Sequence, residues 1–113
     1  MKRTSNLKPV LQPTFIRQWR EYRGLSQDRL VERMREHVVG FSKSTLSRLE
    51  NSRQAYTQPI LEALAECLGC GPADLIMRDP QSQVWSIVDT LQALPADKQA
   101  TVFAMIEGLR KAS

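Results

Sequence analysis

The sequence predicts an all-α fold, in which a five-helix domain is followed by a C-terminal pair of amphipathic helices. Apolar residues recur at spacings of three and four along most of the chain, as they do on one face of a helix. Residues that favour helix starts, such as Ser26 and Ser42, precede these periodic segments, and glycines such as Gly24 and Gly69 follow them. At 113 residues, the chain can form one domain with an appendage, and its core requires no cofactor or disulfide framework.

The first two helices are predicted from apolar stripes and their flanking residues. Thr14 can cap a helix that runs to residue 23 and ends at Gly24. The core face of this helix is expected to carry Phe15, Ile16, Trp19 and Tyr22. Ser26 can cap a second helix that begins at Gln27. Its apolar positions are Leu30, Val31, Met34 and Val38. A turn at residues 40–41 leads into the third helix.

Residues 42–50 are predicted to form a short third helix with two chemically different faces. Leu46 and Leu49 lie three residues apart and are expected to turn inward, while Ser42 can cap the amino end, which favours anions. The outward face carries two cations and two hydroxyls: Lys43, Ser44, Ser47 and Arg48. The cations can donate to guanine O6 and N7 or to phosphate, and the hydroxyls can donate or accept at most base edges. This segment therefore predicts a recognition helix for the major groove of DNA.

Two further helices complete the predicted domain, which spans residues 14–79. The fourth is marked by apolar residues at helical spacing before Gly69: Ile60, Leu61, Leu64, Ala65 and Leu68. The fifth begins at Pro72, because the fixed φ and missing N–H of proline suit the first helical position. Its short body is expected over residues 73–77.

Residues 80–113 form a different kind of segment. Two sets of apolar residues at helical spacing, separated by Pro95, predict two amphipathic helices. The first set is Val84, Ile87, Val88, Leu91 and Leu94, and the second is Val102, Met105, Ile106 and Leu109. These helices could fold back on the first five, or residues 81–113 could pair with the same helices of a second copy. The homodimer is favoured, because a symmetric dimer lets two recognition helices bind half-sites about one DNA turn apart. The alternative is that these residues dock on another protein.

Charge is distributed unevenly along the chain. Residues 1–57 contain twelve Lys or Arg against five Asp or Glu, whereas residues 58–113 contain four against seven. The basic half includes the predicted recognition helix, and a basic surface attracts a polyanion. A solvated positive surface is the alternative. Residues 1–13, which contain Lys2, Arg3 and Lys8, are expected to be a flexible basic arm.

Several segments, taken in order, resemble one known family. They are residues 15–27 (FIRQWREYRGLSQ), 42–51 (SKSTLSRLEN), 61–69 (LEALAECLG) and 73–75 (ADL). Together they are similar to the lambda-repressor-like helix-turn-helix family of the XRE (Cro/CI-like) type, over residues 14 to about 77. The resemblance implies a five-helix lambda-repressor-like DNA-binding domain and a transcriptional regulator, expected to be a repressor that binds a two-fold operator as a homodimer. The alternative is an antitoxin-like protein whose residues 81–113 dock on a toxin or a polymerase subunit, since antitoxins share this DNA-binding fold.

The resemblance also implies roles for individual residues. Lys43, Ser44 and Arg48 match positions that reach base edges, with Ser47 beside them. The positions expected to meet DNA phosphates are Gln27, Thr45, Asn51 and Arg53. Arg20 and Glu50 match a structural ion pair between the first helix and the end of the third.

The sequence departs from the family pattern at two places. Between Val31 and Leu46 it is roughly five residues longer than the pattern, so the second helix is expected to gain a turn. Ser52 replaces a common glycine, so a serine is expected to be strained there if the chain leaves the third helix in the left-handed conformation.

Other functional classes receive little support from the sequence. Cys67 and Cys70 form a Cys-x-x-Cys pair, but both lie at apolar positions where cysteine acts as a small hydrophobe, and only His37 could assist them with a metal. We therefore expect no metal, no cofactor and no enzymatic activity. There is no long apolar run to cross a membrane or direct secretion, so a cytoplasmic protein with reduced cysteines is expected.

Overall fold

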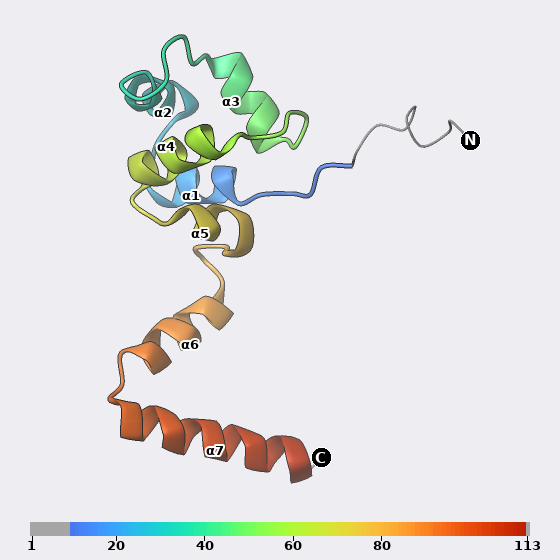
Figure 1. The fold of residues 1–113 in the computed structure, drawn as a ribbon, viewed down its shortest axis with the longest axis vertical. Helices are drawn as coiled ribbons and strands as arrows, with labels where there is room; N and C mark the ends of the chain where they lie inside the picture. Colours follow the sequence, from blue (N-terminus) through green and yellow to red (C-terminus); the bar gives the residue numbers. More distant parts are fainter. Residues whose placement is uncertain (1–9, 113) are drawn as a thin grey trace, which may run out of the picture. The chain divides into compact units, whose positions relative to one another are not determined.

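The computed structural model describes residues 10–112, and the helices in this range confirm the all-α prediction (Figure 1). The predicted arm at residues 1–13 lies mostly outside the described residues. The chain divides into two compact units, residues 1–81 and 82–113. In the first unit, the described residues form α1 (Ile16–Tyr22), α2 (Gln27–Met34), α3 (Lys43–Glu50), α4 (Gln58–Leu68) and α5 (Pro72–Met77). The second contains α6 (Gln83–Gln92) and α7 (Ala96–Ala112).

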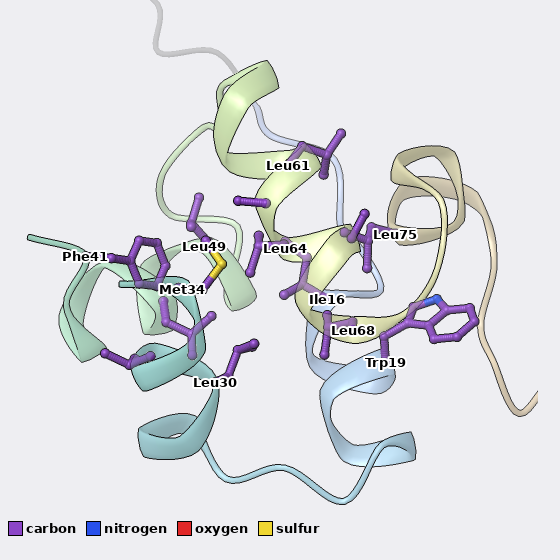
Figure 2. Packing of buried hydrophobic residues seen from close by; sticks show 14 residues of the cluster. Ile16, Trp19, Leu30, Met34, Phe41, Leu49, Leu61, Leu64, Leu68 and Leu75 are labelled. Carbon is purple, nitrogen blue, oxygen red and sulfur yellow. The ribbon is translucent and has the colours of Figure 1, made fainter. Parts of the chain in front are cut away.

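Helix α4 lies at the centre of the first unit, and helices α1, α2 and α5 pack against it (Figure 2). It contributes more buried side chains than any other described helix: Leu61, Ala63, Leu64, Ala65 and Leu68. Side chains from α2 and α3 meet them, and Met34, Leu49 and Leu64 gather in one region of the core. Gly69 ends α4 in the left-handed conformation with φ +68°, as its position after the apolar stripe predicts. This core fixes α3 on the body of the domain.

The start and the apolar stripe of α1 differ from the prediction. The residue before the helix is Phe15, and it makes no side-chain cap; Phe15 N–H instead donates to Leu75 O at 2.7 Å, which ties the start of α1 to α5. Thr14 is therefore not the cap. Tyr22 is 49% exposed, so its expected place on the core face is wrong. Tyr22 is the last residue of α1, and its ring lies against the edge of the core, where it meets the buried Trp19 ring edge to face at 5.7 Å.

The expected extension of α2 does not form as a regular helical turn. The helix ends at Met34, and residues 35–41 form a loop in which Val38 N–H donates to Met34 O at 2.8 Å. Arg35 Nε holds this loop by donating to Phe41 O at 3.0 Å, and Phe41 itself is buried against the core. Gly40, with φ +77°, provides the reversal before α3. The residues by which the chain exceeds the family pattern thus lengthen the loop between α2 and α3, and α3 is still anchored at its start.

The second unit has two helices but no buried residue among those that the structure describes. The turn between α6 and α7 is held by Gln99, whose Nε2 donates to Leu94 O at 2.8 Å and to Gln92 O at 3.3 Å. Apolar side chains on both helices remain exposed, including Val84, Ile87, Met105, Ile106 and Leu109. None of the helices within residues 10–112 combines the length and apolarity needed to cross a lipid bilayer.

Candidate nucleic-acid interface

Helix α3 is anchored by its inner face and its amino end. Leu46 is fully buried and Leu49 is 2% exposed, because residues three apart lie on the same face of a short helix. Ser42 precedes the helix in an extended conformation, and its Oγ accepts a hydrogen bond from Thr45 N–H at 3.2 Å. Both features follow the sequence prediction, and together they orient the rest of α3 outward.

The four residues expected to read bases lie together on the outer surface. Lys43, Ser44, Ser47 and Arg48 line a shallow depression of about 430 Å³, and Gln27 from α2 completes it. Lys43, Ser44 and Arg48 are exposed, and Ser47 is half-buried. The depression therefore presents two cations, two hydroxyls and one amide, all of which can bond to base edges or phosphate oxygens.

The residues expected at phosphates lie in the first turn of α3, just beyond its end and at the start of α2. Gln27 Nε2 donates to Glu50 Oε1 at 3.0 Å, which joins the start of α2 to the end of α3. Thr45 Oγ1 lies 3.0 Å from Ser42 Oγ, so its hydroxyl takes part in the capped first turn. Asn51 is exposed at the end of α3 and donates from Nδ2 to Ser47 O at 2.8 Å. Arg53 is exposed just beyond it.

The chain leaves α3 through a left-handed turn at Ser52, where φ is +56°. Arg53 N–H donates to Arg48 O at 2.8 Å, and Ser52 N–H donates to Leu49 O at 3.3 Å. This pair of bonds is the Schellman arrangement, which usually places glycine at the left-handed position. The serine therefore carries the strain expected where it replaces the usual glycine, and the turn leads into the loop before α4.

Two acceptors near the cations were missed by the sequence analysis. Asp28 Oδ1 lies 3.3 Å from Lys43 Nζ, and Gln54 Oε1 accepts a hydrogen bond from Arg48 Nε at 2.9 Å. Neither contact has a signal in helical spacing, because Asp28 lies on α2 and Gln54 lies in the loop after α3. Each could be found only after the left-handed turn and the packing of α2 on α3 were known.

The ion pair between Arg20 and Glu50 lies behind this surface. Arg20 Nε donates to Glu50 Oε2 at 2.6 Å, and the two side chains are 11% and 2% exposed. Arg20 Nη1 also donates to Leu25 O at 2.9 Å, so the guanidinium joins α1, the α1–α2 turn and α3. The pair belongs to the scaffold that holds α3 and is largely covered from solvent.

A scan against protein families matches residues 14–76 to a helix-turn-helix domain, which is more than half of the chain. The chain belongs to the helix-turn-helix domain family. That family belongs to the lambda-repressor-like, XRE-type group that the resemblance indicates. Comparisons with curated proteins and with solved structures gave no match.

Membership in the helix-turn-helix family suggests DNA binding, and its members are typically not enzymes. In this helix-turn-helix domain, α2 and α3 are consecutive helices that pack on each other, as the two helices of the motif do. The match ends within α5, so α6 and α7 lie outside the region that defines the family.

The two cysteines of the helix-turn-helix region lie away from α3, at the end of α4. Cys67 Sγ contacts Met34 Sδ at 3.7 Å, and burial raises its thiol pKa. Burial also raises the pKa of Cys70 to about 11, with the Asp74 carboxylate adding to the shift and Arg23 opposing it. Both sulfurs are free thiols, and His37 is exposed in the α2–α3 loop. Within residues 10–112, no three His, Cys, Asp or Glu side chains gather to hold a metal ion.

Proposed function

We propose that this protein is a sequence-specific DNA-binding transcriptional regulator, a repressor that binds a two-fold operator as a homodimer through α3 in the major groove. One observation carries the proposal: α3 buries Leu46 and Leu49 while Lys43, Ser44 and Arg48 line an open depression on its other side. An anchored helix with cations and hydroxyls on its free face has the shape and the donors that groove reading requires.

The residues around α3 divide into two proposed roles. Lys43, Ser44, Ser47 and Arg48 read base edges, because they share the open face of the helix. The residues proposed to position the helix on phosphates are Gln27, Thr45, Asn51 and Arg53. Thr45 lies in the first turn of α3, Asn51 and Arg53 follow its end, and Gln27 begins α2. Repression then requires only that the protein occupies its operator and excludes other proteins from that DNA.

The proposed dimer is formed by α6 and α7. Apolar side chains on these helices are 52–73% exposed at Val84, Ile87, Met105, Ile106 and Leu109, and a groove of about 320 Å³ runs beside Leu91, Leu94 and Val102. A unit this small buries too little apolar surface to be stable alone, and association is the usual remedy. Residues 82–113 contain three acidic and three basic side chains, so two copies meet without net repulsion. We therefore propose a second copy of the chain as the partner.

In-vitro selection of DNA from a random pool, with the full chain, tests the DNA-binding proposal. A palindromic consensus with half-sites about one helical turn apart is the expected result. A consensus that contains one half-site only would contradict two-fold binding. If no sequence is enriched over the starting pool, then sequence-specific recognition is wrong.

Sedimentation of the full chain tests the dimer separately from DNA. The wild-type chain is expected to sediment as a dimer, and Ile87→Asp together with Ile106→Asp is expected to yield a monomer, because each places a charge in the apolar face. Val39→Asp is the matched control, since Val39 is 98% exposed and belongs to the α2–α3 loop of the first unit, not to α6 or α7. A monomeric wild-type chain would overturn the homodimer and favour docking of this face on a different protein.

A further inference from the structure

A line of hydrogen-bonding side chains runs along one side of α3. Ser42, Thr45 and Arg48 are spaced three residues apart and therefore lie on neighbouring turns. Ser42 Oγ lies 3.0 Å from Thr45 Oγ1, and Thr45 Oγ1 lies 3.4 Å from Arg48 Nη2. The line ends outside the helix, where Arg48 Nε donates to Gln54 Oε1 at 2.9 Å. Arg48 is thus held from both sides, although it is exposed.

Gln54 reaches Arg48 because of the left-handed turn at Ser52. The backbone bond from Arg53 N–H to Arg48 O, at 2.8 Å, closes the turn over the last residues of the helix. Gln54 is the next residue in the chain. It is half-buried, and its side chain accepts the hydrogen bond from Arg48. The hydrogen-bonded backbone turn therefore places the side-chain amide of Gln54 beside the guanidinium of Arg48.

We propose that Gln54 is a positioning residue that fixes the guanidinium of Arg48 and thereby sets which base pair the helix prefers. This inference rests on the proposed function, because it concerns how the same surface reads DNA. With the Nε N–H bonded to Gln54 and one N–H of Nη2 directed to Thr45, the outer edge of the guanidinium, made by Nη1 and the other N–H of Nη2, remains open to DNA. That edge can donate two parallel bonds to guanine O6 and N7. The hydrogen bond with Gln54 orders a long side chain before DNA arrives, so less conformational entropy is lost on binding.

Lys43 lacks an equivalent arrangement. Its ammonium lies 3.3 Å from Asp28, but the two side chains are 59% and 75% exposed. An ammonium is a point charge that bonds equally well in many orientations, and an exposed ion pair is screened by salt. The planar guanidinium of Arg48 is the group whose orientation matters for base choice, and Gln54 is the side chain that orients it.

Two variants at residue 54 separate positioning from general structure. Gln54→Met keeps the length of the side chain and removes the strong acceptor, whereas Gln54→Glu keeps an oxygen at the same reach. The measurement is the affinity of the full chain for the selected consensus, and for each single base-pair change of it. Arg48→Ala serves as the reference that identifies the base pair read by Arg48. Gln58→Met is the matched control, because Gln58 Nε2 donates to Glu62 on α4 and has no role at Arg48.

Gln54→Met is expected to lower discrimination about 2- to 10-fold at the base pair that Arg48→Ala identifies, which is the cost of ordering one long side chain. Affinity for random DNA should stay unchanged. Gln54→Glu should keep the discrimination ratio even if its charge lowers affinity for all DNA, and Gln58→Met should keep it too. When Arg48 is already Ala, Gln54→Met should have no further effect on discrimination, since the two residues act as one unit.

Three results would overturn the inference. In the first, Arg48→Ala relaxes discrimination at one base pair but Gln54→Met leaves it unchanged. Arg48 would then still read that base pair, but Gln54 would have no part in it. The second is a Gln54→Met effect at a different base pair, or one that adds to that of Arg48→Ala. The third is a failure of Arg48→Ala to relax any base pair, which would remove both the base-reading role and the role of Gln54. Thermal unfolding of each variant checks that the domain is folded. If Gln54→Met does not fold, Gln54→Glu remains as a second variant at the same position.

Discussion

Arg20 and Glu50 form two hydrogen bonds across the domain, from Arg20 Nε to Glu50 Oε2 at 2.6 Å and from Arg20 Nη2 to Glu50 Oε1 at 3.2 Å. Gln27 Nε2 donates to the same carboxylate at 3.0 Å. The last residue of α3 is therefore tied to both α1 and α2. Because α3 is short, fixing this end also fixes the direction of its outer face.

Glu50→Ala is expected to lower the free energy of unfolding by about 3–5 kcal/mol, because it leaves the Arg20 guanidinium buried without its partner. Urea denaturation followed by the fluorescence of Trp19 and Trp85, or by circular dichroism, measures the change. The control is Arg17→Ala, which breaks an ion pair with Glu21 whose side chains are 58% and 55% exposed. That exposed pair should contribute no more than about 0.5 kcal/mol. Equal effects of the two substitutions would show that the Arg20–Glu50 pair is not a special anchor.

Ser52→Gly is expected to stabilise the domain by about 0.5–1 kcal/mol, because glycine adopts the φ of +56° found at Ser52 without steric cost. The hydrogen bond from Ser52 Oγ to Gln12 O is long, at 3.4 Å, and its loss should subtract little. Ser47→Gly provides the opposite case, because residue 47 lies inside α3 and glycine there should destabilise by a similar amount. Thermal unfolding of both variants gives the comparison, and a lower melting temperature for Ser52→Gly would contradict the strain at this turn.

The parts of the fold that were predictable are those with local signals. The inward leucines of α3, the cap at Ser42, the end of α4 at Gly69 and the start of α5 at Pro72 all follow from spacing and from the backbone preferences of single residues. The outer face of α3 followed in the same way, since it is the complement of the buried face.

Contacts between residues distant in sequence had no such signal. Arg23 donates from Nε to Leu68 O at 2.7 Å and from Nη2 to Gly69 O at 3.0 Å, so a side chain near α1 satisfies the carbonyl end of α4. Tyr22 was placed wrongly because helical spacing predicts the face on which a side chain lies, but does not tell whether the core extends as far as the end of that helix. The hydrogen bond between Gln54 and Arg48 depends on the turn at Ser52. The sequence predicted only that Ser52 would be strained if this turn were left-handed, and not that it is.

The thiol of Cys70 is expected to react slowly at neutral pH. Burial, assisted by Asp74, raises its pKa from the ordinary value of 9.0 to about 11, so its thiolate fraction at pH 8 is lowered about a hundredfold. In a folded Cys67→Ser variant, the rate at which Cys70 reacts with a disulfide reagent should still rise above pH 10. When the same variant is unfolded in urea, this rate should level off just above pH 9. A plateau near pH 9 in the native protein would contradict the shift.

The same shift has a consequence for stability. The folded state keeps the Cys70 proton to higher pH than the unfolded state does, so the contribution of this thiol to stability is fully present below pH 9. That contribution is lost as pH rises from 9.0 toward about 11. Urea midpoints of the Cys67→Ser chain across this range, compared with those of a chain that also carries Cys70→Ala, isolate the effect.

Arg48→Ala and Arg53→Ala are expected to weaken DNA binding in different ways, although each removes one exposed guanidinium from the same end of α3. Arg48→Ala should cost about 1–3 kcal/mol on the selected consensus and relax one base-pair position, because a bidentate guanine contact is lost. Arg53→Ala should weaken consensus and random DNA alike and lower the slope of log affinity against log salt by about 1, because a phosphate contact is lost. Titrations at several salt concentrations on both DNAs separate the two. If Arg48→Ala lowers affinity for consensus and random DNA equally, then Arg48 meets the DNA backbone, and base reading must come from Lys43, Ser44 and Ser47 alone.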